Sequence, residues 1–402
     1  MSKFTRAVRD TLRSYFEAGD KPTEEQWHAW IQAIQDGIES HEHKSSGGCG
    51  SGTGDAAPIS FPDTHHDPQL RNIRAWRRRL CTRPDLANRI PARAWTGEEG
   101  QNLVQALVSD GEYVYVGLDT TPAQVVKLDP NSMAAVATWT GQEGQDYCWS
   151  LAWNGDRLYA GLDTEPAQVA MIERDTMKHI TQWVGNEDQT NCAALACDGA
   201  YLYAGLATRP ARVVKLETKA LTTVDEWVHE DPTTACNALL WDGEFLYAGL
   251  SAAVGTVVKI DPDAMAVVAQ APALGEHTCC TSLCTDGSFV YAGYLSALPA
   301  VYKLHRNDLV SADLWAGYED EPYCMSVLYD GESLYAGLWA DIGKVVKLGL
   351  PGLNRISEWQ AAEGAGDCTA LAFDGLYVFF GFYGRPAQVV RKIMRDYNEK
   401  ED

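Results

Sequence analysis

The sequence of 402 residues contains no run of about 18 or more apolar residues, the length that a membrane-spanning helix requires. It also lacks a positively charged start followed by an apolar stretch, which is the pattern of a secretory signal peptide. These absences exclude a transmembrane helix and a conventional signal peptide. We therefore expect a protein that is made in a cytoplasm and does not insert into a membrane.

Positive charge is scarce in most of the chain. Residues 1–94 hold 14 Lys+Arg and 12 Asp+Glu, so the remaining 19 Lys+Arg and 43 Asp+Glu give residues 95–402 a net charge of −24. Such an acidic surface repels nucleic acid and anionic membranes, and it attracts cationic partners or metal ions. A solvated acidic surface also keeps a large β protein soluble. The sequence leaves both interpretations open.

A repeat of 44 residues occupies this acidic part of the chain. One copy begins with the stretch Cys148–Leu162, in which the dipeptide Asn154-Gly155 precedes a Tyr-Ala-Gly-Leu strand. The glycine of that strand recurs at Gly117, Gly161, Gly205, Gly249, Gly293, Gly337 and Gly381. A fixed period in the 40s, built from alternating β-type runs, predicts the blades of a β-propeller.

Each repeat is expected to form four strands. Asp-Gly or Asn-Gly between two β runs predicts a hairpin with a type I′ turn. In the copy above, Cys148–Trp153 and Arg157–Leu162 form the hairpin, and Gln168–Ile172 and His179–Val184 are the third and fourth strands. The expected fold class is all-β, a seven-bladed β-propeller with a small N-terminal α-helical module.

A tryptophan of the fourth strand indicates how the ring closes. It recurs at Trp95, Trp139, Trp183, Trp227, Trp315 and Trp359, with Ala271 in the remaining place. Trp95 precedes the first turn dipeptide, and the last repeat ends before its own tryptophan. We therefore expect residues near 90–95 to supply the outer strand of the last blade, which removes an exposed sheet edge.

Six of the eleven cysteines share one repeat position. They are Cys148, Cys192, Cys236, Cys280, Cys324 and Cys368, and Val104 takes the seventh place. Because valine can fill this position, cysteine serves there as a small apolar residue. We predict buried free thiols. The alternative is a ring of thiolates around a soft metal, although metal sites need converging ligands.

The repeat resembles a known propeller family. Tyr113–Leu118 (Tyr-Val-Tyr-Val-Gly-Leu) and Val125–Asp129 (Val-Val-Lys-Leu-Asp) are similar to the YVTN-like repeats of that family, and the likeness extends over all seven units. The resemblance implies the fold, but propellers include lyases, lactonases, dehydrogenases and pure binding modules. The Gly-His and Trp-Asp pairs of WD40 repeats and the double glycine of kelch repeats are absent.

Residues 1–44 are predicted to form a helical module that assembles the protein. Thr23 and Gln26 have the spacing of a capping box. An apolar stripe follows at Trp27, Trp30, Ile31, Ile34 and Ile38. Two short helices, one over residues 4–16 and one that begins at Pro22-Thr23, cannot bury this stripe alone. The stripe must pack on the propeller, on a partner or on other copies of the chain, and we predict the last, self-association. Residues 16–43, beginning Phe-Glu-Ala-Gly-Asp-Lys-Pro-Thr, resemble the N-terminal segment of phage tail-fibre and related virion-appendage proteins, which implies a homotrimeric attachment stalk.

Three further features precede the repeats. His41 and His43 would offer six imidazoles to a divalent metal in a three-fold assembly, or they are exposed histidines favoured by a helix C-terminus. Residues 45–69 are a Gly/Ser-rich linker by composition. Residues 70–89, rich in arginine, are predicted to be a basic helical segment packed on the propeller of residues 90–402. The alternative is a contact with nucleic acid, which would have to overcome the acidic field of the propeller.

Candidate binding residues fall on one face of the predicted ring. The loops that join each fourth strand to the next first strand carry carboxylates at Glu99, Glu143, Glu187, Asp231, Glu319 and Glu363. This acidic ring would attract cations, unless its members only stabilise turns. The residues that interrupt the repeat on this face are Tyr147, Arg209, Tyr323, Trp339 and Arg385, with the pairs His229-Glu230 and Glu276-His277. His229 and His277 are the candidate metal or acid–base residues.

We therefore expect a non-catalytic structural and binding protein, with no cofactor and no catalytic residue. A propeller head on an assembly module would make a component like a phage tail fibre, incorporated in a virion or an extracellular appendage. Its partners would be other virion proteins or a cell-surface receptor. The alternative is a propeller enzyme, a metal-dependent lyase or hydrolase that uses His229 and His277 with a divalent metal.

Overall fold

The structure is a computed structural model that describes residues 93–393, except residues 276, 297, 319, 320, 322, 341 and 363. The predicted helical module with its apolar stripe, His41 and His43, the linker and the basic segment all lie outside the described residues. The described residues include no helix long and apolar enough to cross a membrane.

The described chain consists of strands joined by turns and loops. The strands are β1 (Arg93–Thr96), β2 (Val104–Ser109), β3 (Val114–Leu118), β4 (Gln124–Leu128), β5 (Ala135–Thr140), β6 (Cys148–Trp153), β7 (Arg157–Leu162), β8 (Gln168–Glu173), β9 (His179–Val184), β10 (Cys192–Cys197), β11 (Tyr201–Leu206), β12 (Arg212–Glu217), β13 (Thr223–Val228), β14 (Ala235–Trp241), β15 (Leu246–Ser251), β16 (Thr256–Asp261), β17 (Ala266–Gln270), β18 (Cys279–Thr285), β19 (Phe289–Leu295), β20 (Ala300–His305), β21 (Ser311–Ala316), β22 (Cys324–Tyr329), β23 (Ser333–Leu338), β24 (Lys344–Gly349), β25 (Asn354–Gln360), β26 (Asp367–Phe373), β27 (Tyr377–Tyr383) and β28 (Gln388–Ile393).

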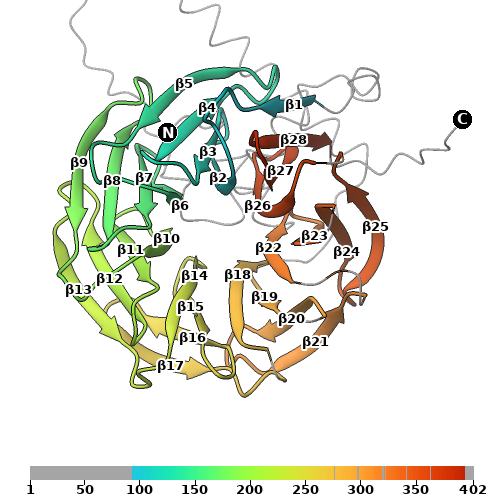
Figure 1. The fold of residues 1–402 in the computed structure, drawn as a ribbon. Coiled ribbons are helices and arrows are strands. Elements are labelled where there is room, and N and C mark those ends of the chain that lie inside the picture. Colours follow the sequence, from blue (N-terminus) through green and yellow to red (C-terminus); the bar gives the residue numbers. More distant parts are fainter. Residues whose placement is uncertain are drawn as a thin grey trace, which may run out of the picture. The chain divides into compact units, whose positions relative to one another are not determined.

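These strands form antiparallel sheets arranged in a ring, with the first strand of each repeat innermost (Figure 1). Five sheets have four strands each, and β14 to β21 form an eight-stranded sheet. Within that sheet, the pair Ser251 and Cys279 is the one register pair that joins β15 to β18. We number the four-strand units in chain order, from the first unit (β2–β5) to the seventh (β26–β28 with β1).

The first described strand closes the ring. β1 pairs antiparallel with β28, and Trp95 lies opposite Val389. The prediction that a segment ending near Trp95 supplies the last outer strand is therefore confirmed. Residues 90–92 of that prediction lie outside the described residues.

The ring has two faces with different loops. On one face, the loops after each second strand bond to the loops after each fourth strand: Ala123 N donates to Gln145 O (2.8 Å), and Asn191 N donates to Thr164 O (3.0 Å). We call this the loop face. The other face, the hairpin face, carries the turn dipeptides and the turns between third and fourth strands. There, the Arg174 side chain bonds to Asp110 of the neighbouring unit (2.6 Å).

The hairpin turns differ from the predicted type I′ geometry. A type I′ turn needs positive φ at both central residues, but Gly155 has φ +101° and Asn154 is not among the residues with positive φ. The side chain of the first residue stabilises the turn instead. Asn154 Oδ1 accepts hydrogen bonds from the N–H groups of Asp156 (2.9 Å) and Arg157 (2.7 Å), as Asx side chains do in turns.

The repeated glycine of each second strand lets the cysteine of the next unit approach closely. A Cβ at Gly161 would lie 2.7 Å from Cys192 Sγ, and one at Gly249 would lie 2.6 Å from Cys280 Sγ. The predicted buried free thiols are confirmed. Burial raises the pKa of Cys192 to about 12, as expected for a thiol packed among apolar groups.

The place of the missing tryptophan is filled from the neighbouring unit. Trp227 lies in one core cluster with Leu250 and Val258 of the next unit. Ala271 instead packs in a cluster with Tyr294 and Tyr302, which occupy the positions of that leucine and valine. At this junction the large side chains belong to the next unit and not to the fourth strand, so the packed volume of the junction is retained.

Candidate functional site

The predicted acidic ring consists of separate exposed side chains. Glu99, Glu143, Glu187 and Asp231 are exposed on the loop face, and Glu319 and Glu363 lie outside the described residues. In the described part of the chain, no three His, Cys, Asp or Glu side chains are arranged to hold a metal ion. The carboxylates therefore contribute a diffuse negative potential to this face.

His229 and His277 each contact a different aromatic group. The His229 ring lies edge-on to Trp227, with centroids 5.6 Å apart, and its Nδ1 accepts a hydrogen bond from Asp231 N (3.1 Å). His277 Nε2 lies 3.1 Å from the Tyr302 hydroxyl, and burial lowers the pKa of His277. These contacts explain the position of both histidines without a shared ligand, and their use by an enzyme stays a prediction.

A group of apolar side chains, three of them aromatic, lies on the loop face of the fifth and sixth units. We call Leu298, Tyr318, Tyr323, Trp339 and Ile342 the aromatic cluster; Tyr323 is partly exposed and the other four are exposed. Tyr318 is 61% exposed and Trp339 is 45% exposed. The rings of Tyr323 and Trp339 meet edge to face, with centroids 5.9 Å apart.

Backbone hydrogen bonds hold the three loops of the aromatic cluster together. Tyr323 N donates to Ser296 O (3.3 Å), and Trp339 N donates to Tyr323 O (3.0 Å). Tyr323 has φ +61°, in the left-handed region that side-chain-bearing residues seldom adopt. These bonds hold in place the backbone from which the aromatic side chains project, which reduces the loop entropy lost on binding.

A buried carboxylate anchors the loop that carries Tyr318. Glu321 is 0% exposed, and it accepts hydrogen bonds from Lys344 Nζ (2.5 Å) and from both terminal nitrogens of Arg355 (2.7 and 2.9 Å). Burial by itself raises the pKa of Glu321, but these hydrogen bonds outweigh burial and lower that pKa to about 2. Arg355 also stacks over the Tyr318 ring at 4.6 Å. The anchor therefore positions Tyr318 directly.

Acidic side chains gather on the same face at the first and second units. The Tyr383 hydroxyl donates to Asp119 Oδ2 (2.6 Å), which links the seventh unit to the first. Burial, together with Asp119 and Glu165, raises the pKa of Asp163 to about 6. The loop face thus combines an acidic sector with an apolar sector.

No family model matches this sequence, and no curated protein matches it. Among solved structures, the chain is similar to one described as the crystal structure of RRP9 WD40 repeats, with a TM-score of 0.63 and 14% identity, over 75% of this chain and 97% of that one. It is also similar to the structure of U3-55K, with a TM-score of 0.62 and 14% identity, over 75% and 98% of the two chains. The fold is a β-propeller. At this identity the likeness concerns the fold alone.

Sequence reasoning found only part of the propeller's aromatic cluster. Tyr323 and Trp339 were expected on the loop face because they interrupt the repeat there, and both belong to the cluster. Tyr318 and the buried Glu321 were missed. A signal was present, because Glu321 stands where Gln145 and Gln189 occur in other units.

Proposed function

We propose that the propeller is a non-catalytic protein-binding module and that its aromatic cluster contacts the partner. The observation that carries the proposal is the exposure of Tyr318 and Trp339 on hydrogen-bonded loops of one face, with a buried ionic anchor whose Arg355 stacks on Tyr318. Tyrosine and tryptophan dominate the energetic centres of protein interfaces. Exposed apolar groups gathered on one rigid surface are typical of interaction sites.

The charge of the loop face favours a basic partner. Glu143, Glu187 and Asp119 add negative potential on this face, and residues 95–402 carry a net charge of −24. Such a potential accelerates the encounter with a cationic protein and disfavours acidic ones. The partner that fits best presents an apolar residue to the aromatic cluster and Lys or Arg side chains to the acidic sector.

The proposed propeller has seven blades. This count treats the eight-stranded sheet as two blades, because the pair Ser251 and Cys279 alone joins β15 to β18. An experimental structure in which β14 to β21 pair continuously as one blade would contradict the count.

The role in a virion appendage is an extension of this proposal. It adds self-association through Trp27, Trp30, Ile31, Ile34 and Ile38 as a homotrimer, so that several propellers would engage a surface together. Multivalent attachment of this kind strengthens binding without new contacts. The extension depends on residues 1–44, which lie outside the described residues.

The binding experiment uses the full chain and compares Trp339→Ala with a matched control, Ile356→Ala. Ile356 is 52% exposed on β25, away from the loop face. Proteins cross-linked to the wild type are identified, expressed and titrated against each variant. We expect Trp339→Ala to weaken binding of the purified partner by about tenfold or more, as the loss of a central interface residue does. Ile356→Ala should leave the affinity unchanged. Equal affinity for all three proteins would refute this binding site.

The enzyme alternative has its own test. The double change His229→Ala and His277→Ala is compared with the wild type by metal analysis of the purified protein. A stoichiometric metal that is lost in the variant would favour the enzyme. The separate contacts of the two histidines predict no difference in metal content.

A further inference from the structure

The hairpin face carries a repeated bridge between neighbouring units. In most units a lysine of the third strand donates to a backbone carbonyl of the next unit. Lys215 Nζ donates to Pro262 O (2.7 Å), and it lies 4.1 Å from the centroid of the Tyr201 ring. Lys127, Lys259 and Lys303 bond across their junctions at 2.9, 3.1 and 2.7 Å. The lysine side chain thus fills the space between the units.

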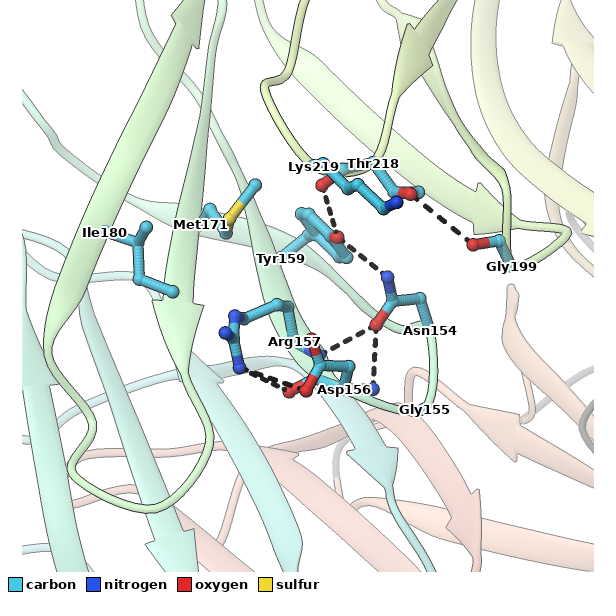
Figure 2. A pocket seen from close by; sticks show the side chains of 10 residues that line it. All are labelled: Asn154, Gly155, Asp156, Arg157, Tyr159, Met171, Ile180, Gly199, Thr218 and Lys219. Carbon is cyan, nitrogen blue, oxygen red and sulfur yellow. Dashed lines mark hydrogen bonds and ion pairs between the residues drawn. The ribbon is translucent and has the colours of Figure 1, made fainter. Parts of the chain in front are cut away.

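The junction between the second and third units departs from this arrangement. Met171 stands in place of the lysine, Arg157 in place of the aromatic residue, and Asn154 in place of the aspartate. A cavity of about 460 Å³ lies at this junction (Figure 2). Thr218 and Lys219 of the third unit line its other side.

The groups that line the cavity differ in their remaining hydrogen-bonding capacity. The Tyr159 hydroxyl is engaged, because it accepts from Asn154 Nδ2 (2.9 Å) and donates to Thr218 O (2.9 Å) (Figure 2). Arg157 bonds through one nitrogen to the exposed Asp156 (3.1 Å). No ion pair joins Lys219 to another described residue within residues 93–393. The side chains of the lining that can still donate hydrogen bonds to a ligand are therefore the cationic Arg157 and Lys219.

Apolar side chains complete the lining. Met171 is buried, and Ile180 is 44% exposed at the edge of the cavity. The cavity has the volume of a site for a small organic molecule. The charged side chains that line the cavity are Arg157, Lys219 and the exposed Asp156, and the aspartate of other units is here the neutral Asn154. The lining therefore carries one net positive charge, which favours an anion.

We propose that this cavity binds a small organic carboxylate with an aromatic or aliphatic body. The carboxylate would bond to Arg157 and Lys219, replacing the exposed pair with Asp156, which contributes little by itself. The apolar body would lie against Met171 and Ile180. This ligand site is on the face opposite the aromatic cluster, and it does not depend on the proposed partner.

The test uses 4-phenylbutyrate as the probe and the full-length protein. Isothermal titration compares it with 4-phenylbutyramide, which has the same body and no charge. We expect the carboxylate to bind at least about tenfold more tightly than the amide, because a charge-assisted hydrogen bond is lost with the amide. Equal affinities, or no saturation up to about 10 mM, which is weaker than small-molecule recognition requires, would overturn the proposal.

Two variants locate the binding. The triple change Asn154→Asp, Arg157→Tyr and Met171→Lys installs the residues that the third unit has as Asp198, Tyr201 and Lys215. We expect it to fold and to lose binding, because a lysine would fill the cavity. If the triple variant is unstable, Lys219→Gln provides a second measurement, because it replaces an exposed side chain. This variant should weaken binding of the probe by about tenfold. Unchanged affinity in a folded triple variant or in Lys219→Gln would refute the site, and Trp339→Ala should bind the probe as the wild type does.

Discussion

Replacement of Glu321 by glutamine should destabilise the propeller in a pH-dependent way. The change removes the charge and keeps the shape, and glutamine already stands at this position in other units, as Gln145 and Gln189. Lys344 and Arg355 would lose the carboxylate that accepts their hydrogen bonds. Both cations are largely buried, so the loss removes the buried counter-charge of Lys344 and leaves Arg355 paired with the more exposed Glu358.

The pKa of Glu321 sets the magnitude. Folding lowers it from 4.5 to about 2, and each unit corresponds to about 1.4 kcal/mol, so the ionised carboxylate contributes about 3 kcal/mol to the free energy of unfolding at pH 7. Because the folded pKa is lowered, this contribution is complete above the unfolded pKa. It falls as the pH decreases from 4.5 toward 2.

Urea unfolding of the wild type and Glu321→Gln, measured at pH 7 and pH 3.5, checks this prediction. The difference in unfolding free energy should be about 3 kcal/mol at pH 7 and about 2 kcal/mol at pH 3.5. The control is Glu358→Gln, because this glutamate is 45% exposed and also pairs with Arg355; its effect should stay below about 1 kcal/mol. A difference for Glu321→Gln that is below about 1 kcal/mol, or that does not change with pH, would show that the anchor does not act through its charge.

Three other predictions concern packing and assembly. Thermal unfolding should show that Ala271→Trp lowers stability by about 1–3 kcal/mol through overpacking and that Tyr302→Val lowers it by about 2–4 kcal/mol by creating a cavity. The double variant should lose at least about 1 kcal/mol less than the sum of the two single losses. Additive losses would contradict the exchange of volume between the units. Trp95→Ala should cost about 3–5 kcal/mol and broaden the melting transition, because this 5% exposed side chain belongs to the closing strand; an unchanged melting curve would argue against closure by β1. A chain that begins near Pro58 should sediment as a folded monomer, and an oligomer would show that residues 1–57 do not assemble the protein.

Local patterns were sufficient to predict the strands of the repeat. The ranges Cys148–Trp153, Arg157–Leu162 and His179–Val184 agree with β6, β7 and β9, and the third strand ends one residue later than predicted. Alternation and turn dipeptides report on the backbone within a few residues, so they are visible without the rest of the fold. Ring closure was also predictable, since one tryptophan, Trp95, preceded its repeat.

Contacts between units were decided by the tertiary structure. The sequence shows that Gly161 and Cys192 recur with the same period, but not that a Cβ at the glycine would lie 2.7 Å from the thiol. It shows Glu321 as an ordinary acidic residue, whereas packing brings Lys344 and Arg355 to its carboxylate. These relations join residues that are distant in the sequence, and no local period encodes the distance between them.

The separation of the two candidate histidines has the same origin. His229 and His277 were paired because each lies beside a glutamate in neighbouring inter-unit loops, yet each ring packs against the aromatic residues of a different unit. The sequence by itself determined the strands, the repeat and the closing segment, because these depend on backbone preferences and counting. Only the tertiary structure decided which side chains meet at the anchor, the aromatic cluster and the cavity, because this depends on how neighbouring units pack.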